Sequence, residues 1–355
     1  MISEQSSCMI AERVDFEVID VLDVPAQMKK SIDKMGPTDS WIIKAMALGA
    51  TGVAGELLGM LKYTPNGLIL PDDWSSRGTD AGALIDVMDI VRGVEGSYAE
   101  FQNPKWPLLP QTVLRDHRKF EKFGDDSYTG PMNFDIETFE STYDLLLKTS
   151  NPAFGEAMAE TLDPRSEKYL GHRENLTLQI DPSKWMIFEG LSPITSPIMR
   201  QARRIGRAAI DESLIYVSQM RPSGLLERSV FSPRKQARSP IYNHPNSHDR
   251  MSFRMSERLQ SVLPLVSGHA ELDHKKRVHA KVIIAIVKDF LLPNGDRYTG
   301  QIALVGSHNY THSGIFAGTQ EMAMLITDDQ LVEQLRDWVE KTFPDECQSR
   351  GSCYN

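Results

Sequence analysis

The stretch RVHAKVIIAIV, residues 277–287, places two polar side chains inside an apolar run rich in β-branched residues. Such a run is typical of a buried strand. Side chains two residues apart on a strand point to the same face, so we expect His279 and Lys281 side by side. Burying an imidazole and an ammonium group is costly unless a ligand or a reaction needs them. The stretch therefore predicts a functional site.

The first half of the chain repeats this pattern. His117 and Lys119 have the same spacing in HRKFEKF, and in both copies a strand-like segment leads on to Gly-x-x-Asn. The first copy is GPMN, which ends at Asn133, and the second is GSHN, which ends at Asn309. A β-hairpin would return each Gly-x-x-Asn to the side of its His-x-Lys.

Strand and helix patterns alternate in both copies, which predicts an α/β protein. We expect two related halves, each a mixed sheet flanked by helices, packed as a pseudo-dimer around one shared centre. The predicted limits are an N-terminal segment at 1–35, a first half at 36–147, a connector at 148–195, a second half at 196–345 and a tail at 346–355. Strands are expected near 40–49, 66–73, 94–101 and 213–220, and helices near 52–63, 82–93, 196–213 and 327–343.

Length and composition set the broad class. The chain has 355 residues and a net charge of −9, so its surface as a whole does not favour nucleic acid, although a local basic groove is compatible with it. Three cysteines near the termini indicate free thiols in a reducing compartment and form no metal cluster. No signal peptide or spanning segment is evident, so we expect a cytoplasmic protein that would meet a lipid substrate at the membrane periphery.

The paired motifs resemble the signature of the phospholipase D superfamily, which is His-x-Lys, a nearby Asp and then Gly-Ser/Gly-x-Asn. The resemblance covers residues 115–145 and 275–326 and implies two phospholipase D-like halves that share one phosphodiesterase site, without metal or cofactor. It implies catalytic roles for six residues and supporting roles for three more. The six are His117, Lys119, Asn133, His279, Lys281 and Asn309, and the three are Ser307, Glu321 and Asp144.

Several positions depart from that signature. The first half is one residue short, so its motif Asp is either Asp125 or Asp126. Pro131 follows Gly130 where Ser or Gly is expected, which removes a hydroxyl and a backbone N–H donor. In the second half Asp289 comes three residues late.

Two such motifs suit phosphodiester chemistry. One neutral imidazole can attack phosphorus to give a phosphohistidine, and the other can protonate the leaving alcohol and later deprotonate water or an alcohol. The two lysines and two asparagines can hold the non-bridging oxygens by charge-assisted hydrogen bonds. The residues leave open which histidine attacks, and the resemblance favours His117. It also implies that Glu321 and Asp144 each accept a histidine's other ring hydrogen.

Three functions remain open at this point. The favoured one is a phosphodiesterase or phosphatidyltransferase, acting as a monomer on a phospholipid headgroup ester. The alternatives are a nuclease and a phosphate-binding relative without activity, against which the second imidazole argues. The headgroup, and the choice between hydrolysis and transfer, are not fixed by the residues.

His308 and His312 could touch substrate or serve local structure. The basic run 228–254 fits either a phosphate-steering loop or a solvated one, and QARRIGRAA, 201–209, is typical of the polar face of a helix.

Overall fold

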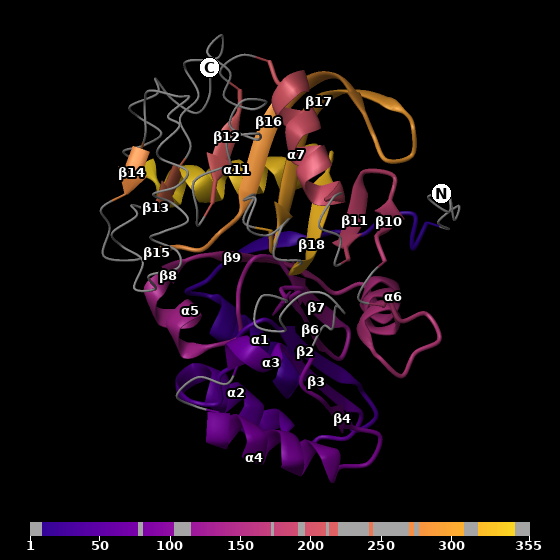
Figure 1. Ribbon diagram of the computed structural model, residues 1–355, viewed down its shortest axis with the longest axis vertical. Coiled ribbons are helices and arrows are strands. Elements are labelled where there is room, and N and C mark those ends of the chain that lie inside the picture. The colour runs from indigo at the N-terminus through magenta and orange to yellow at the C-terminus, as the bar shows by residue number, and fades with distance from the viewer. Residues whose placement is uncertain are drawn as a thin grey trace, which may run out of the picture.

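The structure is a computed structural model that describes residues 9–76, 81–102, 115–171, 174–190, 196–210, 213–218, 241–243, 270–272, 277–308 and 319–344. It is a mixed α/β fold with two large sheets. Figure 1 shows the first sheet and its helices in indigo and magenta below, and the second sheet above, with its later strands β16, β17 and β18 in orange and yellow.

The first sheet has the order β1 (Glu17–Asp20), β9 (Leu145–Thr149), β7 (Asp126–Thr129), β6 (Phe120–Phe123), β2 (Trp41–Ala45), β3 (Gly67–Pro71), β4 (Tyr98–Ala99). The second has the order β10 (Leu176–Asp181), β11 (Lys184–Glu189), β18 (Thr319–Ile326), β17 (Arg297–Gly306), β16 (Val282–Leu291), β12 (Ile215–Val217), β13 (Ile241–Asn243), β14 (Ala270–Leu272). When β1 of the first sheet is matched with β11 of the second, the strands that follow in the two orders correspond one to one. In each sheet the successive pairs are first antiparallel and then, at the far end, parallel. The expected relation between the halves is therefore confirmed.

Helices cover the outer face of each sheet. On the first sheet α1 (Val24–Asp33), α2 (Gly52–Leu61) and α4 (Ala81–Arg92) bury a core that includes Trp41 and Leu58. On the second, α7 (Pro197–Ala208) packs Ile205 against Tyr216 and Ile283. Helices α3 (Asp73–Ser76), α5 (Ile136–Ser141) and α6 (Pro152–Leu162) complete the described helices of the first half and the connector.

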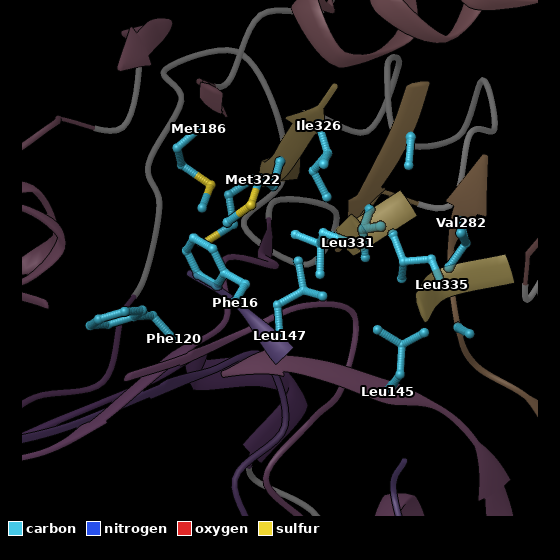
Figure 2. Packing of buried hydrophobic residues seen from close by; sticks show 14 of the residues in the cluster. Phe16, Phe120, Leu145, Leu147, Met186, Val282, Met322, Ile326, Leu331 and Leu335 are labelled. Atoms are coloured by element: carbon cyan, nitrogen blue, oxygen red, sulfur yellow. The ribbon is translucent and has the colours of Figure 1, made fainter. Parts of the chain in front are cut away.

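A third core joins the two halves. Figure 2 shows Phe120, Leu145 and Leu147 of the first half facing Met322 and Val282 of the second. The last helix, α11 (Asp329–Thr342), adds Leu331 and Leu335 to this core. Its Gln334 side chain accepts a hydrogen bond from the Val18 N–H at 3.0 Å, and Trp338 donates to Asp20 at 2.8 Å. Burial of so much apolar surface between the halves holds them in one arrangement.

Local signals explain most element ends. Ser196 caps α7 by accepting a hydrogen bond from the Met199 N–H at 3.0 Å, and Pro197 occupies the first helical position as predicted. The predicted helices near 52–63, 82–93 and 327–343 are present, and so are the strands near 40–49, 66–73 and 213–220.

Some expectations need correction. The run 94–101 forms only the two-residue β4, and the stretch around His279 is not one strand. β15 (Arg277–Val278) ends before the histidine and β16 begins at Val282, so the motif occupies a break between them. Separately from these corrections, β1, from residues 1–35, lies in the first sheet, and β10 and β11, from 148–195, lie in the second sheet. The domain limits themselves stay predictions.

Of the basic run 228–254, only 241–243 falls within the described residues. In the part of the chain that the structure describes, no helix has the length and apolar character needed to cross a membrane.

Candidate functional site

Each His-x-Lys segment reaches the site through a short parallel pairing with the other half. β5 (Arg115–Asp116) pairs with the start of β18, matching Asp116 with Gln320. The His117 N–H then donates to the Gln320 carbonyl at 2.8 Å. This pairing brings His117 alongside the next residue of β18, Glu321.

The second histidine segment has the same arrangement with the roles of the two halves exchanged. β15 pairs with β8 (Thr142–Tyr143), matching Val278 with Tyr143. The His279 N–H donates to the Tyr143 carbonyl at 2.9 Å. His279 therefore lies beside the residue that follows β8, which is Asp144.

The carboxylates and imidazoles consequently pair across the two halves. His279 Nδ1 is 2.5 Å from Asp144 Oδ2 in hydrogen-bonding geometry, and His117 Nδ1 is 3.0 Å from Glu321 Oε1. The second contact is close enough for an ion pair, but its N–H direction is not aligned with the oxygen. Catalytic hydrogen bonds are often poorly aligned without substrate and tighten when it binds.

These pairs fix the reactive face of each ring. A carboxylate beside Nδ1 favours the tautomer with hydrogen on Nδ1, which leaves the Nε2 lone pair free. The His117 side chain is 15% exposed and that of His279 is 9% exposed, so both rings are largely shielded from water. Each ring can thus offer one nitrogen to a bound phosphate.

The two lysines also occupy equivalent places. Lys119 Nζ donates to the carbonyl of His117 at 3.0 Å, and Lys281 Nζ donates to the carbonyl of His279 at 2.5 Å. Both lysines are buried. Lys119 interacts electrostatically with Glu321, Asp144, Lys281 and His279. His117 joins this set through its contact with Glu321. The two His-x-Lys pairs and both carboxylates therefore form one cluster of titratable groups.

Burial and like charge shift the pKa values within this cluster. Burial, and then the charge of the nearby Lys119, lower the pKa of Lys281 to about 7. Burial and then the charge of Lys281 lower the pKa of His279 to about 4, although Asp144 opposes this. Burial would raise the pKa of Glu321, but the contact with His117 and the charges of His308 and Lys119 together outweigh burial and bring that pKa to about 2. At neutral pH Glu321 is ionised and His279 is neutral.

The motif glycines let each Gly-x-x-Asn loop lie against a carboxylate-bearing strand. Gly130 has φ +156°, and a Cβ there would lie 3.0 Å from the Leu145 carbonyl oxygen. A Cβ at Gly306 would collide with the carbonyl oxygen of Met322. Leu145 directly follows Asp144, and Met322 directly follows Glu321. The contact of Gly130 with Leu145 is therefore equivalent to that of Gly306 with Met322.

Ser307 and Pro131 make the two carboxylates unequal. The Ser307 hydroxyl hydrogen-bonds to Glu321 and also accepts from the Met322 N–H at 3.0 Å. Pro131 can do neither, and Asp144 instead accepts from the Leu145 N–H at 3.0 Å. Pro131 therefore leaves Asp144 in place and supported.

The remaining predicted residues have separate outcomes. Asn133 is buried and its Oδ1, a hydrogen-bond acceptor, has no partner, whereas Asn309 lies outside the described residues. Asp126 is bound by Ser31 at 2.5 Å at the far end of the β6–β7 hairpin and is structural. Asp289 is exposed and pairs with Arg297 at 3.2 Å. His312 also lies outside the described residues.

Two more groups lie beside this cluster: His308, for which the sequence left contact with substrate or a local structural role open, and Glu189, which sequence reasoning did not consider. His308 is buried and interacts electrostatically with Glu321, His117 and Lys281, and burial first of all lowers its pKa to about 4. Glu189 lies directly opposite Glu321 on β11, and its carboxylate accepts a hydrogen bond from Ser196. Nothing in the local sequence marks Glu189, because only the strand register brings it there.

Among the described residues, no group of three or more His, Cys, Asp or Glu side chains is arranged to hold a metal ion. A comparison with models of known protein families finds no match, and neither does a comparison with curated proteins.

Solved structures do share the fold. Phosphatidylserine synthase from Haemophilus influenzae Rd KW20 is 12% identical with a TM-score of 0.59, over 96% of this chain and 87% of that one. Yeast tyrosyl-DNA phosphodiesterase is 10% identical with a TM-score of 0.51, over 88% of this chain and 89% of that one. Polyphosphate kinase from Porphyromonas gingivalis is 12% identical with a TM-score of 0.53, over 91% of this chain and 49% of that one. At such identities these likenesses establish a common fold.

Proposed function

We propose that the protein is a phosphodiesterase of the phospholipase D type that hydrolyses or exchanges a phospholipid headgroup ester through a phosphohistidine intermediate. The observation that carries the proposal is the reciprocal pairing of His117 with Glu321 and of His279 with Asp144 across the two halves. A site that only bound phosphate would not need two imidazoles, each oriented by a buried carboxylate.

In the proposed reaction, Nε2 of one histidine attacks phosphorus and forms an N–P bond while the P–O bond to the leaving alcohol breaks. The second histidine gives its proton to the leaving oxygen. That histidine then removes a proton from water or an acceptor alcohol, whose oxygen attacks phosphorus and releases the first ring. By resemblance, His117 is the nucleophile and His279 the acid and base.

The other groups of the cluster support this sequence. Lys119, Lys281 and the two motif asparagines would hold the non-bridging oxygens, without a metal ion. A bound phosphate adds negative charge beside Lys281 and His279, which raises the pKa of both and favours their protonated forms. Ser307 would keep Glu321 directed at His117.

The lipid substrate is favoured over nucleic acid by two features. The net charge of −9 does not attract a polyanion, and phosphatidylserine synthase is a fold neighbour of high coverage. A nuclease using the same residues is the second candidate, supported by the shared fold of tyrosyl-DNA phosphodiesterase. In either case we expect a monomer in the cytoplasm, with peripheral membrane contact for a lipid substrate.

The purified protein, incubated with EDTA, should be offered mixed phospholipids, single-stranded DNA and RNA in parallel. Release of a free headgroup or of phosphatidic acid supports the lipid function, and added glycerol distinguishes transfer from hydrolysis. Shortened oligonucleotides with untouched lipid would select the nuclease. No turnover of any of them, or of bis(p-nitrophenyl) phosphate, would contradict the enzymatic function.

A further inference from the structure

Helix α7 carries a stripe of arginines on its solvent side. Arg200, Arg203, Arg204 and Arg207 follow the spacing of one helix face, and the helix contains no acidic residue. The opposite face, with Ile198, Met199, Ala202 and Ile205 among its residues, is buried in the core of the second half. At about 1.5 Å per residue, the stripe is about 10 Å long.

These arginines differ from others on the surface. Arg13, Arg92, Arg165 and Arg297 each form an ion pair with a nearby aspartate. Within the described residues, no guanidinium of the α7 stripe takes part in an ion pair or hydrogen bond. Unneutralised like charges at this spacing repel one another, and they stand out on a chain whose net charge is −9.

The stripe begins close to the candidate site. Ser196, the cap of α7, hydrogen-bonds to Glu189, and Glu189 lies opposite Glu321 on the neighbouring strand. Figure 1 shows α7 lying in front of β16, β17 and β18. A flat anionic surface bound to the stripe would therefore lie beside the helix whose capping residue contacts the candidate site through Glu189.

We infer that the arginine face of α7 is a docking surface for anionic lipid headgroups at a bilayer. Four guanidinium groups in a line complement a plane of phosphate charge. Ile210 comes two residues after the end of α7 and is 48% exposed, which adds an apolar side chain suited to a lipid interface. A nucleic acid would leave that isoleucine without a role. The inference rests on the proposed function in one respect, the lipid substrate.

The test uses the full chain and the variant R200Q/R204Q/R207Q, which neutralises three of the four arginines and leaves Arg203, whose Nε is buried without a partner. Gln and Arg have similar helix propensities, so α7 should persist, as circular dichroism and Tm would verify. The matched control is K29Q/K30Q/K34Q on and just after α1, the equivalent helix of the first half. It removes the same charge from exposed positions that lie beside Asp33.

Binding is measured by sedimentation with vesicles of phosphatidylcholine containing 30% phosphatidylglycerol, and with pure phosphatidylcholine vesicles. Each basic residue near an anionic surface contributes about fivefold to binding, so the α7 variant should bind the anionic vesicles roughly a hundredfold more weakly. The control should bind like the parent protein. Binding by the parent should fall in high salt and be weak on phosphatidylcholine alone.

Turnover of soluble bis(p-nitrophenyl) phosphate separates this inference from the proposed function. The α7 variant should keep this turnover and lose turnover of vesicle lipid. Equal loss of vesicle binding in both variants, or no loss in the α7 variant, would overturn the inference while leaving the enzyme intact. Tight, arginine-dependent binding of a 40-nucleotide single strand without vesicle binding would also overturn it. Absent turnover of every substrate would instead reject the proposed function.

Discussion

His279 and Asp144 lie 2.5 Å apart although 135 residues separate them in the chain and they come from different halves. The contact exists because the residues before each of them, Val278 and Tyr143, pair as parallel strands. The same pairing on the other side brings His117 to Glu321. Neither half can therefore assemble a complete histidine–carboxylate pair alone.

The first prediction concerns these carboxylates. Asp144→Asn and Glu321→Gln keep the size of each side chain but remove the charge that stabilises a protonated imidazole. We expect each to lower kcat by roughly 10²-fold or more, with little change in KM, because the acid and base His279 and the nucleophile His117 each lose the carboxylate that orients the ring. Steady-state kinetics on bis(p-nitrophenyl) phosphate measures this. A wild-type kcat in Asp144→Asn would contradict this prediction, because it would show that His279 works without the carboxylate of Asp144.

Ser307 provides a second prediction. Ser307→Ala removes the hydroxyl that holds Glu321, so the His117 ring should lose part of its alignment. We expect a loss of about tenfold in kcat, in line with removal of one hydrogen bond to a charged group. Pro131→Ala, at the equivalent place in the first half, is the comparison and should change kcat by less than about twofold. Equal effects would mean that Ser307 acts only through folding.

The pH dependence of substrate binding follows from Lys281. Its pKa is lowered to about 7, so its charge is present below pH 7 and is lost as the pH rises through that value. The KM for an anionic phosphodiester should therefore rise between pH 6.5 and 8.5. Lys281→Arg keeps a charge at every pH, so its KM should be nearly constant over this range. A parallel rise of KM in the arginine variant would exclude Lys281 as the titrating group.

Glu189 gives a prediction about stability. Burial raises the pKa of Glu189 to about 8. The hydrogen bond from Ser196 opposes this rise, and the charge of Glu321 adds to it. A carboxyl whose pKa is raised on folding stabilises the fold at low pH, and that contribution is lost as the pH rises from about 4.5 to 8. Glu189→Gln should therefore gain stability relative to the parent as the pH rises from 5 to 8, by a few kcal/mol at most. Urea unfolding at both pH values measures it, and a constant difference would contradict an ionising Glu189.

The fold was predictable from its repeats. Two copies of His-x-Lys followed by Gly-x-x-Asn, each among alternating strands and helices, indicate two related halves, and the matched strand orders bear this out. Short-range signals such as the Ser196–Pro197 helix start were equally reliable, because they act within one turn. The interruption of the strand at His279 was not predictable, since it depends on pairing with β8 from the other half.

The candidate site was predictable only where a motif marks its residues. His117, Lys119, His279 and Lys281 share one cluster as expected, but the partners that complete it depend on tertiary register. Glu189 reaches Glu321 only because β11 and β18 pair in one particular alignment. A local sequence pattern cannot fix such an alignment, which is set by the packing of whole sheets.

The central claim is that two imidazoles, one from each half, act on a single phosphate. Turnover of bis(p-nitrophenyl) phosphate in EDTA by His117→Asn, His279→Asn and the double variant tests it most directly. If the rings work as one unit, each single variant loses at least about 10³-fold and the double variant loses no more than either, because the effects of such residues are not additive. Appreciable turnover in one single variant, or a double variant whose loss is the product of the two single losses, would contradict the claim.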